Sequence, residues 1–172
     1  MLIIKPAHFT VIKEEAIKNY PLECCGLLVG KRESEKRIIE EVIPTINDWE
    51  NQRQNFTEIM NKADLGSREN FSIAPQIIFQ TQKKARENNL DIIGIYHSHP
   101  DHSCHPSAFD EALAWVNYSY IIVSVRSGAV HNWQSWYLNS DGKLIQENTF
   151  SQKGKGQGAK GKGKLKDSLD YH

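Results

Sequence analysis

The sequence predicts one layered domain of the α/β or α+β class. Two observations favour this class: short apolar runs of strand length are mixed with segments of helical periodicity, and these patterns continue to about residue 150. The chain has 172 residues, which is enough for a single domain with a buried core. We therefore expect one domain at residues 1–150 and no internal repeat.

The N-terminal segment predicts a strand followed by a helix. Residues 2–5 form a short apolar run. Residues 7–20 have helical periodicity, and their shared apolar face consists of Phe9, Ile12, Ala16 and Tyr20. Pro21 should end this helix, since proline cannot continue the helical hydrogen-bond ladder.

A hairpin is expected next. Residues 23–30 form a nearly continuous apolar run after Glu23, which predicts a buried strand, and residues 35–46 predict its antiparallel partner across a charged turn. Residues 47–73 are polar and irregular, with a short helix expected near Phe56–Leu65. Such a long connection in a compact domain is often functional.

The second half of the chain repeats the mixture of helices and strands. We expect helices at 75–89 and 106–117, and strands at 91–99, 120–126, 133–138 and 143–146. The last two strands flank Asn139-Ser140-Asp141-Gly142, which is a strong turn signal.

The tail at 151–172 differs in composition from the domain. It contains six Lys and two Asp among many glycines and has almost no apolar residues. Such a segment cannot bury enough surface to become ordered, so we expect a disordered, solvated tail.

Composition also limits the setting and the partners. The remaining residues carry 15 basic and 19 acidic side chains without a cluster of Lys and Arg, which argues against a nucleic-acid partner. No apolar stretch approaches the roughly 18 residues of a membrane span, and the N-terminal apolar run is too short for a secretory signal. Three cysteines form no even disulfide framework. We expect a cytoplasmic protein that has no membrane partner.

The densest chemical signal is a histidine cluster, since four of the seven histidines lie between positions 97 and 105. His97 and His99 are two apart on an expected strand, so their side chains share one face. Ile93 and Ile95 have the same parity, which predicts that this face is buried. Two imidazoles at the end of a strand suit a zinc site, although an ordinary packed and solvated pair is the alternative.

Ser107 and Asp110 follow at the start of the expected third helix, three residues apart and therefore facing the same way. Asp110 would complete a set of two histidines and one carboxylate, which leaves a fourth position for water as in catalytic zinc sites. The alternative for Ser107 and Asp110 is a capping box, and the two roles are compatible at a rigid helix start.

The spacing His97-Ser98-His99-Pro100, then Ser107 and Asp110, resembles the JAMM motif of the MPN-plus metalloproteases, H-x-H-x7-S-x2-D with an upstream glutamate. Glu23 resembles that glutamate. The resemblance covers residues 2–147. It implies a cytidine-deaminase-like MPN fold with a mixed, largely antiparallel curved sheet flanked by helices.

The resemblance also implies a mechanism. His97, His99 and Asp110 would bind one Zn²⁺ per chain, with a water as the fourth ligand. Glu23 would be the general acid and base, and Ser107 would donate a hydrogen bond to the developing oxyanion. The implied substrate is a peptide or isopeptide bond at the C-terminal glycine of a ubiquitin-like or sulfur-carrier protein.

Two other functions stay open at this point. His97-Ser98-His99-Pro100-Asp101-His102 also fits the binuclear signature of metallo-β-lactamase-like hydrolases, although Glu23 and the Ser107–Asp110 spacing are then unexplained. A module that binds a ubiquitin-like protein without cutting it is the other. We further hypothesise that Cys104 could occupy the open zinc position in a resting state, whereas Asp101, His102 and His105 are expected to be solvated loop residues.

Overall fold

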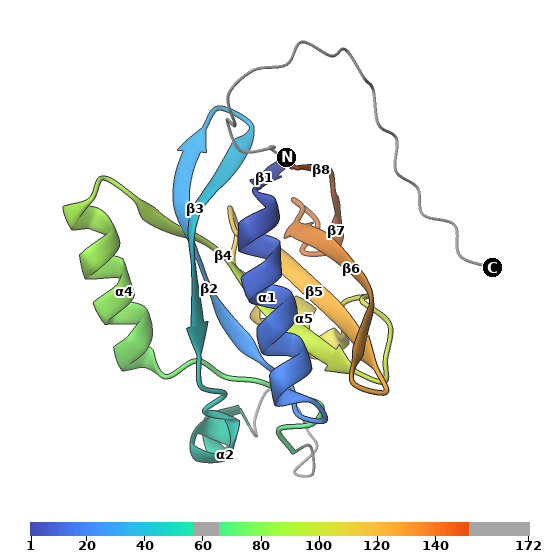
Figure 1. Ribbon diagram of the computed structural model, residues 1–172. Helices are drawn as coiled ribbons and strands as arrows, with labels where there is room; N and C mark the ends of the chain where they lie inside the picture. Colours follow the sequence, from blue (N-terminus) through green and yellow to red (C-terminus); the bar gives the residue numbers. More distant parts are fainter. Residues whose placement is uncertain (57–65, 152–172) are drawn as a thin grey trace, which may run out of the picture.

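The computed structural model describes residues 1–56 and 66–151. Eight strands form one sheet in the order β7-β6-β5-β4-β2-β3-β1-β8, and helices flank it (Figure 1). The strands are β1 (Leu2–Ile4), β2 (Cys25–Glu33), β3 (Lys36–Thr45), β4 (Asp91–Pro100), β5 (Ser119–Arg126), β6 (Ala129–Leu138), β7 (Leu144–Glu147) and β8 (Thr149–Ser151). The helices are α1 (Pro6–Asn19), α2 (Trp49–Gln52), the 3-10 helix η1 (Arg53–Phe56), α4 (Pro75–Glu87) and α5 (Ala108–Leu113).

The sheet is mixed, as predicted. β4 runs parallel to β5, and β1 runs parallel to both β3 and β8. The other neighbours are antiparallel, including the expected β2–β3 hairpin. β4 lies in the interior of the sheet between β2 and β5, so its backbone is paired on both sides.

Separate apolar clusters cover the two faces of the sheet. On one face, α1 places Ile12 and Ala16 against Leu28, Ile121 and neighbouring buried residues. On the other face, α4 packs through Ala85 and Ile78 over a second cluster on β2 and β4. The face that carries α4 also carries the histidines of β4.

The expected parity of β4 is wrong at Ile93. The pairing of β4 with β2 passes from Gly94 opposite Leu28 to Ile92 opposite Val29, which leaves Ile93 without a partner. This β-bulge turns Ile93 toward the cluster under α1, whereas Ile95 stays on the face of the histidines. The face is buried as expected, but Ile92 and Ile95 line it.

The third expected helix is shorter than residues 106–117. α5 ends at Leu113, and Ala114 is already extended with φ −68° and ψ 135°. The N–H of Trp115 donates to the Tyr120 hydroxyl at 2.6 Å, so it is withdrawn from any helical ladder. Asn117 then takes a left-handed φ of 66°, which turns the chain back into β5.

The remaining segments differ from the expectations as follows. The polar connection after β3 contains α2 and η1, which the periodicity did not indicate. The short helix expected near Phe56–Leu65 falls almost wholly outside the described residues. β8 was not predicted either, and it reaches Ser151 at the sheet edge beside β1. The disordered tail stays a prediction, since residues 152–172 lie outside the described part.

Within residues 1–56 and 66–151, no helix is long and apolar enough to cross a membrane.

Gly94 allows the close approach of β4 to β5. A Cβ added there would lie 2.2 Å from the carbonyl oxygen of Ser119 on β5, a contact that real side chains cannot form. We expect Gly94→Ala to lower the free energy of unfolding by about 1–3 kcal/mol in urea denaturation, because the paired strands must separate. Gly66→Ala is the control, since no atom lies within 4 Å of its added Cβ. Equal stability of the two variants would contradict this tight approach.

Candidate metal centre

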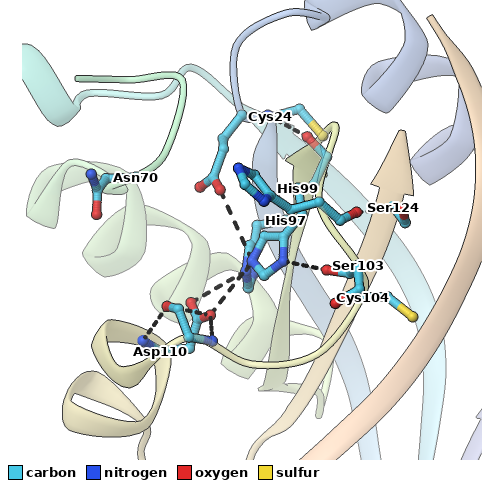
Figure 2. A network of polar contacts seen from close by, with 12 residues as sticks. Cys24, Asn70, His97, His99, Ser103, Cys104, Asp110 and Ser124 are labelled. Atoms are coloured by element: carbon cyan, nitrogen blue, oxygen red, sulfur yellow. Dashed lines mark hydrogen bonds and ion pairs between the residues drawn. The ribbon is translucent and has the colours of Figure 1, made fainter. Parts of the chain in front are cut away.

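The C-terminal part of β4 presents two imidazoles on one face of the sheet. His97 lies opposite Cys25 of β2 and Ile122 of β5, so the paired backbone on both sides fixes its position. His97 is buried with only 1% of its surface exposed, and His99 is also buried. The two Nε2 atoms lie 3.0 Å apart (Figure 2).

Asp110 reaches the same point from the first turn of α5. Ser107 is the N-cap of α5, and the expected capping box is present. The Asp110 Oδ2 accepts hydrogen bonds from the Ser107 N–H at 2.7 Å and from the Ser107 hydroxyl at 2.8 Å, while the Asp110 N–H donates to the Ser107 Oγ at 3.1 Å. These bonds hold the carboxylate in one orientation.

The three side chains form a group that can hold a metal ion. The Asp110 Oδ1 lies 3.2 Å from the His97 Nε2, and the Asp110 Oδ2 lies 3.5 Å from the His99 Nε2. Ligand atoms at bond lengths of roughly 2.0–2.1 Å around a tetrahedral zinc are roughly 3.3 Å apart. The 3.0 Å between the two Nε2 atoms and the 3.2 Å from the His97 Nε2 to the Asp110 Oδ1 are close to this spacing, and the other carboxylate oxygen makes the contact with His99.

The hydrogen bonds of His99 fix its tautomer. Its Nδ1 lies 2.8 Å from the carbonyl oxygen of Ser103, which can only accept, so Nδ1 carries the proton. The Nε2 lone pair of the neutral ring is then directed at the metal position. A backbone carbonyl that orients a ligating histidine in this way is typical of protein metal sites.

His97 is held by packing instead. Its ring stacks on Phe71 with centroids 4.4 Å apart, and its Nδ1 has no hydrogen-bond partner among the described residues. Burial lowers the pKa of His97, which favours the neutral imidazole. Metal ligation requires that form.

Asp110 is held as a carboxylate. Burial acts to raise its pKa, but the neighbouring imidazoles and the Ser107 N–H outweigh burial, so the pKa of Asp110 lies well below its ordinary value. The group therefore offers two imidazole nitrogens and one carboxylate anion, which suits a divalent cation.

Glu23 lies beside this group just before β2. Its Oε1 is 4.0 Å from the His99 Nε2, and its side chain is 5% exposed. Burial raises the pKa of Glu23 well above the ordinary value, and the charges of Asp110 and Glu69 add to that effect. The backbone N–H of Glu23 donates to the Ser67 carbonyl at 2.9 Å. A carboxyl with a raised pKa takes up a proton more readily than an ordinary glutamate, which suits a general base that must later release that proton.

The site opens into a cleft of about 420 Å³ that is lined mostly by polar residues. Glu23, His99, Ser107 and Asp110 line it together with the loop after β4. A smaller, mostly apolar cavity between α4 and α5 lies on the other side of Asp110 and shares Phe71, Phe109 and Asp110 with the cleft. The metal position therefore lies where a polar and an apolar hollow meet.

The loop between Pro100 and Pro106 walls the cleft without supplying metal ligands. Asp101, His102 and His105 are exposed, as expected. The Asp101 carboxylate accepts hydrogen bonds from the Tyr20 hydroxyl and from Arg68. These residues are outside the metal-binding group that the described residues form.

The hypothesis that Cys104 occupies the open metal position is wrong. Cys104 is buried in an apolar cluster with Tyr120, Ile122, Trp136 and Leu144. The Trp136 Nε1–H donates to the Cys104 carbonyl at 2.9 Å, which fixes this part of the loop. The sulfur points away from the histidines (Figure 2).

Sequence reasoning missed three neighbours of the site. Phe71 and Asn47 lie in the long connection after β3, where no periodicity marks them. Ser103 acts through its backbone carbonyl, which any residue could supply. The only available signal was the unusual length of the connection.

Comparison with known proteins matches residues 5–139 to a family described as prokaryotic homologs of the JAB domain. Desampylase of Haloferax volcanii is 31% identical over 113 residues, which are 65% of this chain and 69% of the relative. A solved structure from Desulfitobacterium hafniense has a TM-score of 0.70 and 27% identity, covering 90% of this chain and 94% of the other. One from Salinibacter ruber has a TM-score of 0.61 and 27% identity, covering 88% and 92%.

The capping box yields a prediction about metal affinity. Ser107→Ala removes the hydroxyl that binds the Asp110 carboxylate, so we expect zinc affinity to fall roughly 10–100-fold, as for other outer-shell partners. Competition with a chromophoric chelator measures this. Ser103→Ala is the matched control, because Ser103 contacts His99 through its main chain and should keep the wild-type affinity. Equal affinities of both variants would show that the cap does not orient Asp110.

Proposed function

The chain belongs to the family of prokaryotic homologs of the JAB domain, and on that premise we propose that it is a zinc-dependent hydrolase. Its reaction would be cleavage of a peptide or isopeptide bond at the C-terminal glycine of a ubiquitin-like or sulfur-carrier protein. Family membership confirms the resemblance that the spacing of His97, His99, Ser107 and Asp110 indicated. The observation that carries the proposal is the buried Glu23 carboxyl next to the metal-binding group.

His97, His99 and Asp110 would hold the zinc. The two Nε2 atoms lie 3.0 Å apart, and each lies 3.2–3.5 Å from a carboxylate oxygen of Asp110. When bound, zinc would supply a Lewis acid and lower the pKa of water in its fourth position towards about 7.

Glu23 would move the proton in this reaction. The carboxyl is a buried part of the cleft wall and lies 4.0 Å from a metal ligand, so it would reach the attacking water and the leaving nitrogen. Glu23 would take the proton from the water and deliver it to the leaving amine. Its raised pKa favours the first of these transfers, because the carboxylate then binds a proton more strongly.

Ser107 would stabilise the negative charge that develops on the scissile carbonyl oxygen. Its side chain is exposed to the cleft, where a substrate can reach it. The hydroxyl proton is donated to Asp110 in this structure. Rotation of the hydroxyl would redirect it to the oxyanion, while the Ser107 N–H keeps Asp110 in place.

The relative supports the substrate class. In keeping with the name of that relative, desampylase, a ubiquitin-like protein is the first substrate to test for this chain. The cytoplasmic location stays a prediction, as does the absence of a nucleic-acid partner.

The structure argues against one of the two alternative functions and leaves the other to experiment. A binuclear hydrolase would need Asp101 and His102 as ligands, but the Asp101 carboxylate is engaged by Tyr20 and Arg68, and His102 is exposed. A binding module without catalysis keeps the same fold, so it is separated from the hydrolase by experiment.

Metal content tests the ligand assignment. We expect purified protein to hold one equivalent of zinc and the double variant His97→Ala/His99→Ala to hold none, because only one ligand remains. Elemental analysis after dialysis measures both. The control is His131→Ala, an exposed histidine on β6 that should retain the full equivalent. Two equivalents in wild type, or zinc retained by the double variant, would contradict the assignment.

Glu23→Gln tests catalysis separately from binding. The amide cannot carry the proton, so we expect cleavage of a Gly-Gly-ended ubiquitin-like fusion to slow by roughly 10²–10⁴-fold. Zinc content and substrate affinity should be retained. Glu14→Gln, at an exposed position of α1, is the control for loss of a charge. If Glu23→Gln cleaves as fast as wild type, Glu23 is not the acid and base; if wild type binds but never cleaves, the chain is a binding module.

A further inference from the structure

The side-chain amide of Asn47 makes four hydrogen bonds, each to a different backbone group. Its Nδ2 donates to the Glu23 carbonyl at 3.0 Å and to the Asn70 carbonyl at 2.9 Å. Its Oδ1 accepts from the Trp49 N–H at 3.0 Å and from the Ser72 N–H at 3.2 Å. An asparagine amide offers two donors and two acceptor sites, so the capacity of this one is fully used.

The chemistry of these partners specifies asparagine. The two groups facing Nδ2 are carbonyls, and the two facing Oδ1 are N–H groups, so a flipped amide would lose all four bonds. Aspartate has the same shape but no donors. It would place a carboxylate oxygen against the Glu23 and Asn70 carbonyls while keeping both acceptor bonds. Asn47→Asp therefore removes half of the network selectively.

Asn47 links the two parts of the site that lie outside β4 and α5, namely Glu23 and the segment around Phe71. One bond ends on the peptide group of Glu23. The others reach Asn70 and Ser72, which flank Phe71, the residue stacked on His97. A parallel bond from the Asp48 N–H to the Ser72 carbonyl at 2.8 Å reinforces the link. Asn47 thus connects Glu23 to the ring that packs on a metal ligand.

We propose that Asn47 is a positioning residue that holds Glu23 at its working distance from the metal centre. This rests on the proposed function of Glu23. Among the described residues, two hydrogen bonds hold the Glu23 backbone: its N–H donates to the Ser67 carbonyl, and its carbonyl accepts from the Asn47 amide. Loss of the second bond lets the carboxyl shift, and displacements of about 1 Å cost roughly 100-fold in rate.

The kinetic test uses full-length Asn47→Asp and a ubiquitin-like protein whose terminal Gly-Gly is fused to a fluorescent reporter. We expect kcat to fall roughly 10–100-fold, while KM stays within about threefold, because no substrate contact changes. Zinc content should stay at the wild-type level. Asn55→Asp is the matched control, an exposed asparagine that donates to the Gln52 side chain and should keep the wild-type kcat.

Amide hydrogen exchange gives a second readout that needs no activity. In Asn47→Asp the Glu23 N–H keeps its Ser67 acceptor, but the Glu23 carbonyl loses the Asn47 donor. Opening of this segment should then cost less, so we expect the Glu23 amide to exchange at least roughly tenfold faster. The Trp49 amide still donates to the residue 47 side chain and should keep its protection. Wild-type kcat in the folded variant, zinc loss, or an unchanged Glu23 amide would each overturn the positioning role. A wild-type protein that never cleaves would refute the proposed function. In that case, the exchange rate of the Glu23 amide in wild type and in Asn47→Asp would still show whether Asn47 anchors Glu23.

Discussion

Three buried polar groups meet at the C-terminal part of β4, and the fold around them has to keep their ligand atoms apart. His97 and His99 share one face of β4, and Asp110 approaches them to within 3.2 Å. Buried polar groups are costly unless they are paired. Here each is held from outside the group: His99 by the Ser103 carbonyl, His97 by aromatic packing and Asp110 by Ser107. The donor atoms are thereby kept at coordination distance.

This constraint explains why the supports are spread over the whole chain. β4 lies between β2 and β5, so the histidines cannot shift along the sheet. The loop after β4 is tied to β6 by the bond from Trp136 to the Cys104 carbonyl. The connection after β3 supplies Phe71 and, through Asn47, anchors Glu23. Segments distant in sequence therefore form one rigid pocket.

The sequence predicted the parts of this arrangement that are local. Residue spacing placed His97 and His99 on one face, and the Ser107–Asp110 spacing indicated the capping box. Strand parity failed at Ile93, because a bulge depends on the neighbouring strand. The end of α5 could not be predicted, since the Trp115 N–H leaves the helix for a hydroxyl on β5. Contacts made by backbone carbonyls, or by residues of a polar connection, leave no pattern in the sequence.

The proposed chemistry depends on one zinc ion with two imidazoles, one carboxylate and an oxygen ligand from water. X-ray absorption at the zinc edge of the loaded protein tests this most directly. The account predicts nitrogen and oxygen neighbours at roughly 2.0–2.2 Å, with the multiple-scattering signature of His97 and His99. A sulfur neighbour at roughly 2.3 Å, or a second metal at roughly 3.5–4 Å, would contradict it.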